Sequence, residues 1–350
     1  MPPTALRATP EHERTPLYVL TGFLGSGKTT LLNSLLRTSA FANTAVIVNE
    51  FGEIGLDHHL IASATDNVVL LDSGCLCCAL SGSLEETLAD LHRRRATGEI
   101  KSFARVVIET SGLADPGPIL NTLLGHRLVT DFYKLAAMLC TVDVQRVAGQ
   151  LARHGEARRQ IAMADQLLLT KTDLTATMEV ARTRELCAGL NPQALCHESK
   201  PGEVPLDAFG PAGSPRLHPA YLPAAEHRSD IRAHCFTLDA CVTWAGIAAW
   251  SRLLSETFGE RLLRTKALLR VSDTPGAVFI QGVGCVFHRP ERLPVWPSTD
   301  PRGHIVCIVQ NVQAEALRQC LAALTVEAGV DARFTLGDLQ VAWPAQIENR

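Results

Sequence analysis

The chain has 350 residues, of which 46% are hydrophobic and 20% charged, a composition typical of a soluble globular protein. Its 33 lysines and arginines against 36 aspartates and glutamates give a formal net charge of −3, which argues against the concentrated basic face that a nucleic-acid partner requires. No apolar run approaches the roughly 20 residues that cross a membrane, so we expect no membrane association. The length favours two domains, since domains average about 150 residues.

Residues 1–15 are rich in proline and charge and lack the apolar core of a signal peptide. We therefore expect a short disordered lead and a cytoplasmic protein. In that reducing compartment, a chain with 11 cysteines is expected to use clustered thiols for metal binding or redox chemistry rather than for disulfides.

Short apolar segments alternate with helical patterns through the first half of the chain. Continuous apolar strands that alternate with helices are typical of a parallel sheet covered on both faces. We predict an α/β fold of the P-loop type, with a mostly parallel sheet. The strands are expected at residues 17–20, 44–48, 68–71, 105–108, 137–142 and 166–169, and helices at 29–37, 84–94 and 146–163.

The composition and periodicity of the sequence change after residue 190. Residues 191–230 hold many prolines and glycines and little periodicity, which indicates loop and linker. Regular patterns then resume, and they predict a smaller α+β unit with an antiparallel sheet and helices on one face. The elements expected there are strands at 233–238, 262–271, 277–281 and 304–309 and helices at 242–258 and 313–323. The predicted domains are a lead (1–15), an α/β domain (16–200), a linker (201–230) and the α+β domain (231–350).

The first strand runs directly into GFLGSGKTT, residues 22–30, which is the G-x-x-x-x-G-K-[ST] pattern between a strand and a helix. Its glycines let the backbone N–H groups curl toward phosphate oxygens, and the positive end of the following helix adds to the attraction. Lys28 is expected to neutralise the β and γ phosphates, and Thr29 to offer its hydroxyl to Mg²⁺. A chance glycine-rich turn is the alternative, and the flanking elements disfavour it. The predicted phosphate-binding residues are Gly22, Gly25, Ser26, Gly27, Lys28, Thr29 and Thr30.

Four further predicted strands are followed by loops that contain many polar or cysteine side chains. Ligands of open α/β sheets bind at the carboxyl ends of the strands, so this concentration predicts a ligand at that edge. The loops are NEFGEIGLD (49–57), DSGCLCC (72–78), ETSGLADP (109–116) and TKTD (170–173).

The third loop begins with Glu109, at a position where an acidic residue reaches Mg²⁺ directly or through water. Gly112 can present its N–H to the γ-phosphate, so the segment is predicted to act as a nucleotide-dependent switch. The alternative is that Thr110 or Ser111 caps the next helix, and both roles can coexist.

The TKTD loop is predicted to recognise guanine. The Asp173 carboxylate can accept two N–H donors from a guanine edge, and the stem of Lys171 can lie along the base. Thr170 occupies the position where this motif usually has Asn. The alternative is an ordinary strand-to-helix turn capped by Thr172 or Asp173. We expect GTP and GDP as ligands.

Cys75, Cys77 and Cys78 place three sulfurs within four residues. Three thiolates suit Zn²⁺ and leave a fourth position for another ligand or a partner. The alternatives are buried cysteines that act as small apolar residues, and a redox dithiol. We expect these three residues to bind a metal.

These motifs, in this order and spacing, resemble the CobW-like GTPases, a P-loop class that includes metallochaperones and metalloenzyme-maturation factors. The resemblance extends to residues 190–194, 281–283 and 296–297 and covers nearly all of the chain after residue 15. It implies a GTP-hydrolysing chaperone that couples nucleotide state to the delivery of a divalent metal, zinc or cobalt, to a client metalloprotein. The His-rich stretch of many relatives is absent, since residues 211–230 hold only His218 and His227.

In this interpretation Lys28, Glu109 and Glu50 form the catalytic set, with Glu50 the candidate for positioning water, and Thr29 and Glu109 serve Mg²⁺. Two alternatives stay open, namely a nucleotide-dependent assembly factor without catalytic turnover and a P-loop kinase acting on a small molecule. A kinase would leave the cysteine loop unexplained. Whether copies of the chain associate with one another is also open.

Overall fold

A computed structural model describes residues 14–49, 68–72, 83–200, 203, 205–209, 230–297, 300–327, 332–336 and 339–343. The chain divides into two compact units, one of residues 1–187 with 194–213 and the other of residues 188–193 with 214–350. Most of the predicted lead and linker lies outside the described residues, and Thr15, assigned to the lead, is the buried first residue of a strand. Across the described ranges, every helix is too short or too polar to cross a membrane.

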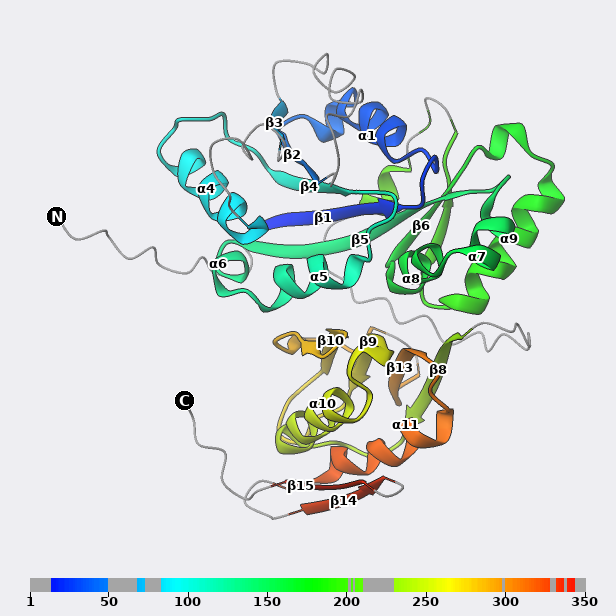
Figure 1. Ribbon diagram of the computed structural model, residues 1–350. Coiled ribbons are helices and arrows are strands. Elements are labelled where there is room, and N and C mark those ends of the chain that lie inside the picture. Colours follow the sequence, from blue (N-terminus) through cyan, green and yellow to red (C-terminus); the bar gives the residue numbers. More distant parts are fainter. Residues whose placement is uncertain are drawn as a thin grey trace. The chain divides into compact units, whose positions relative to one another are not determined.

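The first unit is built on a seven-stranded sheet in the order β3-β2-β4-β1-β5-β6-β7. Every neighbouring pair is parallel, which confirms the predicted α/β fold (Figure 1). The last strand, residues 195–198, lies in a segment that the sequence predicts to be loop. It has only four residues and none of them is buried, so it contains no apolar run that would indicate a strand. The strands are β1 (Thr15–Gly22), β2 (Thr44–Asn49), β3 (Val68–Asp72), β4 (Arg105–Thr110), β5 (Tyr133–Asp143), β6 (Gln166–Thr170) and β7 (Leu195–Glu198).

Helices cover both faces of this sheet, with α1 on one side and α5 and α8 on the other (Figure 1). Tyr18 and Leu20 of β1 share a buried cluster with the leucines of α1, because alternate side chains of a strand point to the same face. The helices are α1 (Lys28–Leu36), α4 (Leu84–Ala96), α5 (Pro116–Gly125), α6 (Arg127–Thr130), α7 (Val147–Arg153), α8 (Gly155–Met163) and α9 (Thr177–Leu190), with 3-10 turns η2 (Ser39–Phe41), η3 (Thr172–Leu174) and η4 (Leu206–Phe209).

The single helix predicted over residues 146–163 is wrong, because the chain forms two helices there. His154 has extended dihedrals, φ −124° and ψ 116°, between α7 and α8. The next residue is Gly155, and glycine in a helix interior costs about 1 kcal/mol relative to alanine. A break at this point therefore loses little helical stability, and α8 begins at Gly155 as a separate helix.

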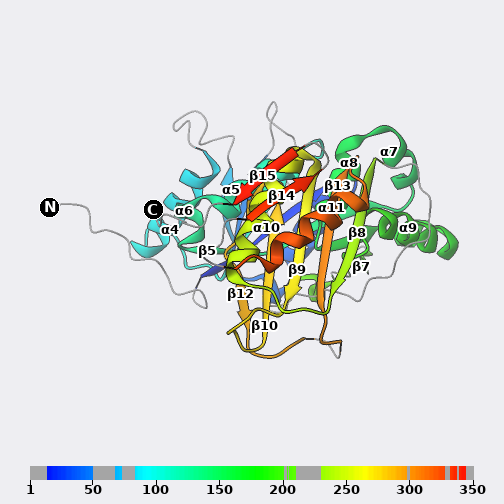
Figure 2. The same ribbon diagram turned by 90° about the horizontal axis from the view of Figure 1, so that it is seen from below.

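The second unit is a smaller antiparallel sheet in the order β11-β10-β9-β13-β8, with β12 paired to β10. Figure 2 shows these strands side by side, with α10 and α11 over one face. The elements are β8 (Ile231–Leu238), α10 (Trp244–Phe258), η5 (Gly259–Arg261), β9 (Leu262–Leu269), β10 (Ala277–Val283), β11 (Val286–Phe287), β12 (Glu291–Leu293), β13 (Gly303–Gln310), α11 (Ala314–Cys320), η6 (Leu321–Thr325), and the separate hairpin β14 (Ala332–Leu336) and β15 (Leu339–Trp343).

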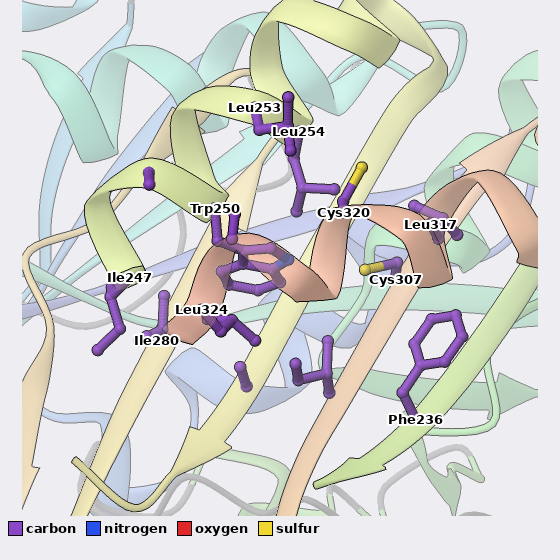
Figure 3. Close-up of a cluster of buried hydrophobic side chains, with 14 of the residues drawn as sticks. Phe236, Ile247, Trp250, Leu253, Leu254, Ile280, Cys307, Leu317, Cys320 and Leu324 are labelled. Atoms are coloured by element: carbon purple, nitrogen blue, oxygen red, sulfur yellow. The ribbon is translucent and has the colours of Figure 1, made fainter. Parts of the chain in front are cut away.

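The core of the second unit lies between the two helices and the sheet. Trp250 of α10 is fully buried and faces Ile280 and Cys307, which come from the strands below it (Figure 3). An indole of this size contributes a large share of the buried apolar area of a small domain. The predicted α+β unit with helices packed on one face of an antiparallel sheet is therefore confirmed.

Candidate nucleotide site

Three of the predicted loops meet at the carboxyl edge of the central strands. β1 lies between β4 and β5, and its residue Gly22 is level with Thr141 of β5. On the other side, Glu109 of β4 is level with Leu20. Parallel strands that end together bring the loops after residues 22, 109 and 170 to one place, as the sequence predicted.

The loop after β1 needs glycine at three positions. Gly22, Gly25 and Gly27 have φ of 144°, 70° and 93°, values at which other residues are strained. A Cβ on Gly22 would also lie 2.2 Å from Oγ1 of Thr141 and 2.6 Å from its carbonyl oxygen. The loop can follow this path only with glycine, so the backbone conformation itself requires the glycines of the motif.

Helix α1 then begins at Lys28. Its N-cap residue, Gly27, makes no side-chain cap hydrogen bond, and the first turn contains no acidic residue. The N-terminal amides and the positive end of the helix dipole therefore face the loop without a built-in counter-charge, an arrangement that favours an anion such as phosphate.

Lys28 extends across the loop, and its Nζ donates to the carbonyl oxygen of Gly22 at 3.0 Å. Its side chain is only 8% exposed, so the ammonium is held within the loop. The Ser26 hydroxyl is also buried and hydrogen bonds to the Thr141 hydroxyl at 2.6 Å. The Ser26 side chain thus fixes the loop to β5, and its backbone N–H donates to the carbonyl oxygen of Phe23 at 3.1 Å.

Thr29 and Glu109 are in direct contact, although 80 residues separate them in sequence. The Thr29 hydroxyl donates to Oε1 of Glu109 at 2.7 Å, and Glu109 is 1% exposed at the end of β4. A hydroxyl and a carboxylate are oxygen ligands of the kind that Mg²⁺ accepts beside phosphate. The donor set therefore fits the predicted magnesium site.

The segment after β4 packs tightly against the phosphate loop at Gly112. A Cβ there would lie 2.7 Å from Cδ2, 2.8 Å from N and 2.9 Å from Cα of Leu24. On its other side, Nε2 of the buried Gln160 donates to the carbonyl oxygens of Gly112 at 3.1 Å and Ala114 at 3.0 Å. The segment is thus held between the phosphate loop and Gln160 of α8.

The helix-capping alternative for Thr110 and Ser111 is wrong, because the N-cap of α5 is Asp115. Its Oδ1 accepts the backbone N–H of Gly117 at 2.9 Å, and its Oδ2 accepts from Arg159 at 2.7 Å. The Thr110 hydroxyl instead donates to that of Thr21 at 2.9 Å.

Thr170, which stands where the base-recognition motif usually has Asn, contacts the phosphate loop. Its buried hydroxyl donates to the carbonyl oxygen of Ser26 at 2.7 Å and to that of Val142 at 3.2 Å. The side chain thus ties the loop after β6 to the loop after β1.

Asp173 is exposed and lies in η3. The N-cap residue of this turn is Lys171, which makes no side-chain cap hydrogen bond, so neither Thr172 nor Asp173 is the cap of η3. Within the described part of the chain, the Asp173 carboxylate makes no hydrogen bond or ion pair. The acceptor pair predicted for guanine is therefore available to a ligand.

Comparison with known proteins follows the same division of the chain. Residues 16–198 match the CobW/HypB/UreG nucleotide-binding domain, and residues 231–325 match the C-terminal domain of the cobalamin synthesis protein cobW. The chain belongs to the CobW/HypB/UreG family.

Relatives within this family resemble the chain over most of its length. The zinc chaperone YjiA of Escherichia coli is 32% identical, with 87% of this chain and 97% of the relative covered. The zinc-regulated GTPase metalloprotein activator 1 of Schizosaccharomyces pombe is 30% identical, with 83% and 79% covered. The crystal structure of the Zn(II)-bound YjiA GTPase from E. coli is similar with a TM-score of 0.69, 28% identity, and coverage of 89% of this chain and 99% of that one.

The predicted metal ligands of this CobW-family chain, Cys75, Cys77 and Cys78, lie outside the described residues, as does Glu50. Within the described ranges, His, Cys, Asp and Glu side chains form no group of three or more that could hold a metal ion. Burial raises the pKa of the Cys140 and Cys307 thiols to about 12. Both thiols are buried, as expected for cysteines that act as small apolar residues of the core.

The sequence did not single out Gln160 or Asp143, which both lie at this site. Gln160 was one polar residue in an amphipathic helix, and only its position on the buried side distinguishes it. Asp143 is the last residue of the apolar strand β5, and an acidic residue at the end of an apolar strand is also the signal that indicates Glu109. Applying that signal to β5 would have found it.

Proposed function

We propose that this CobW-family protein hydrolyses GTP and couples its nucleotide state to the binding and delivery of Zn²⁺ to a client metalloprotein in the cytoplasm. The observation that carries the proposal is the contact of Thr29 with Glu109 beside the glycine loop. A phosphate loop, a pair of magnesium ligands and a loop with an exposed acceptor pair lie at one edge of one sheet, and together they suit GTP hydrolysis.

In the proposed mechanism, the glycine loop and Lys28 bind the phosphates. Thr30, in the first turn of α1, belongs to the same phosphate-binding set. Thr29 and Glu109 would hold Mg²⁺, which would neutralise charge on the phosphates. Gly112 offers its N–H to the γ-phosphate, and Glu50 positions the attacking water.

The metal and the client are inferred from the cysteine motif and from the relatives. Cys75, Cys77 and Cys78 offer soft thiolate ligands, which suit Zn²⁺. Relatives named as a zinc chaperone and as a zinc-regulated metalloprotein activator favour zinc over cobalt and a metalloprotein as the recipient. The second unit is proposed to recognise that client.

The test is the linkage between metal and nucleotide. If GTP tightens Zn²⁺ binding, Zn²⁺ must tighten GTP binding by the same factor, and typical couplings correspond to about 5- to 150-fold. We expect a difference in this range between GDP and a non-hydrolysable GTP analogue when Zn²⁺ is titrated against a chelator. Because thiolates must be deprotonated to bind, Zn²⁺ affinity should also fall as the pH is lowered.

Replacement of Cys75, Cys77 and Cys78 by Ser should remove both the high-affinity Zn²⁺ binding and its response to nucleotide. A variant with Cys241→Ser and Cys285→Ser removes two exposed thiols elsewhere and serves as the matched control. Undiminished Zn²⁺ affinity in the triple variant would show that the ligands are wrong. Affinity that is indifferent to nucleotide would leave a GTPase with a structural metal site.

Asp173→Asn should lower GTP affinity and relax discrimination against xanthosine triphosphate, because an amide replaces one carboxylate acceptor with a donor. Loss of a hydrogen bond to a charged group costs about 1.5–3 kcal/mol, so a drop of roughly 10- to 150-fold is expected. Competitive displacement of a fluorescent nucleotide measures it. Glu179→Gln, a charge change at an exposed position of α9, is the control. Wild-type protein that binds ATP as tightly as GTP would refute the guanine assignment.

A further inference from the structure

Asp143, the last residue of β5, carries a fully buried carboxylate. Its Oδ2 lies 2.6 Å from Nζ of Lys171, and its Oδ1 accepts the backbone N–H of Gln145 at 3.0 Å. A buried carboxylate is costly unless a cation and hydrogen bonds compensate it. The buried Asp143 carboxylate therefore depends on the Lys171 ammonium as its counter-charge.

The same ammonium is bound to the phosphate loop. Nζ of Lys171 also donates to the carbonyl oxygen of Gly25 at 2.9 Å. The Lys171 side chain thus runs from the end of β6 to the glycine loop, and its head is fixed by two acceptors. A lysine side chain is otherwise flexible, so these two contacts order the Lys171 side chain beside the glycine loop.

Lys171 also has an unusual backbone. Its φ of 60° is in the left-handed region, which a residue other than glycine adopts only where its surroundings hold it there. Its carbonyl oxygen accepts from the N–H of Leu174 at 3.1 Å and from the hydroxyl of Thr175 at 3.0 Å. These bonds shape the turn that presents Asp173, so the direction of Asp173 depends on the conformation of Lys171.

We propose that Asp143 is a positioning residue for base recognition. Its charge holds Lys171 in the conformation that lines the base and aims Asp173 at the guanine edge. This inference rests on the proposed binding of GTP. The Lys171 side chain is 31% exposed. Without the charge on Asp143, water therefore replaces the carboxylate as the partner of the Lys171 ammonium, and Lys171 leaves its left-handed backbone conformation.

Asp143→Asn tests the proposal, because the amide has nearly the same shape, retains an oxygen for the Gln145 N–H, and lacks the charge. We expect GTP affinity to fall about 10-fold, corresponding to ~1.4 kcal/mol, and ATP affinity to fall less than about 2-fold on the same scale. The difference arises because the phosphate loop remains intact while base recognition is lost. Displacement of a labelled nucleotide by GTP and by ATP gives the ratio of the two affinities.

Asp300→Asn is the matched control. Asp300 accepts a backbone N–H two residues on at 3.0 Å and the guanidinium of Arg302 at 2.9 Å, so it has the same two kinds of partner as Asp143, but it belongs to the second unit. Its replacement should leave the ratio of GTP to ATP affinity unchanged.

A double-mutant cycle with Lys171→Met separates positioning from stability. Lys171→Met should lower both the GTP-to-ATP ratio and the melting temperature, because the Asp143 carboxylate loses its cation. Adding Asp143→Asn to that variant should restore part of the melting temperature and leave the ratio unchanged, as expected for two residues that act as one unit.

Two results would overturn the assignment. A lower melting temperature with a wild-type ratio in Asp143→Asn would make Asp143 a structural residue only, as would additive effects on the ratio in the double variant. Wild-type protein without a preference for GTP would instead overturn the proposed guanine binding itself.

Discussion

Lys28→Ala is expected to lower the affinity for GTP by about 10- to 150-fold, which corresponds to roughly 1.5–3 kcal/mol for one hydrogen bond to a charged group. The structure explains why one side chain has so large an effect. The Lys28 side chain is buried and its Nζ is held over the loop by the carbonyl oxygen of Gly22 at 3.0 Å. The ammonium is therefore already in place when the phosphates arrive. Isothermal titration with a non-hydrolysable GTP analogue measures the loss.

Lys28→Met distinguishes charge from packing, since it retains most of the aliphatic stem. It should lose as much affinity as the alanine variant while the melting temperature stays closer to that of the wild type. Equal GTP affinity of wild type and Lys28→Ala would refute the phosphate-loop assignment.

Glu109→Gln is expected to reduce the rate of GTP hydrolysis about 100-fold, the effect of removing one well-placed electrostatic group from an active site. Glutamine keeps an oxygen for the Thr29 hydroxyl, which now lies 2.7 Å from the Glu109 carboxylate. The local structure should therefore survive, and the missing negative charge should weaken Mg²⁺ binding. Single-turnover phosphate release, measured over a series of Mg²⁺ concentrations, should show both the lower rate and a shift of its midpoint to higher Mg²⁺.

Glu185→Gln makes the same chemical change at an exposed position of α9 and should leave the rate and the midpoint unaltered. If Glu109→Gln hydrolyses GTP with wild-type dependence on Mg²⁺, the carboxylate does not serve the ion. Its contact with Thr29 would then be structural.

Elements whose signals are local could be predicted from the sequence. Six strands of the first sheet follow from continuous apolar runs, and the glycine loop follows from a motif that lies between a strand and a helix. Glycine at residues 22, 25 and 27 is dictated by backbone dihedrals, which a local pattern encodes. Predictions of this kind succeeded because the required information lies within a few residues.

Weak local signals were misread. β7 is too short and too exposed to produce an apolar run, and the break at His154 interrupts a pattern that otherwise continues from α7 into α8. In both places the strand pairing or the packing of the helices, and not the local sequence, decides the outcome.

Which side chains contact one another depends on the tertiary fold. The contact of Thr29 with Glu109 spans 80 residues, and that of Asp143 with Lys171 spans 28. Each pair forms because parallel strands that are distant in sequence end at the same edge of the sheet. The order of strands is set by long-range pairing and crossover connections, so no local pattern could show that Lys171 reaches both Asp143 and the glycine loop. The sequence named the chemistry of the site, and the packing of the sheet fixed how its groups hold one another.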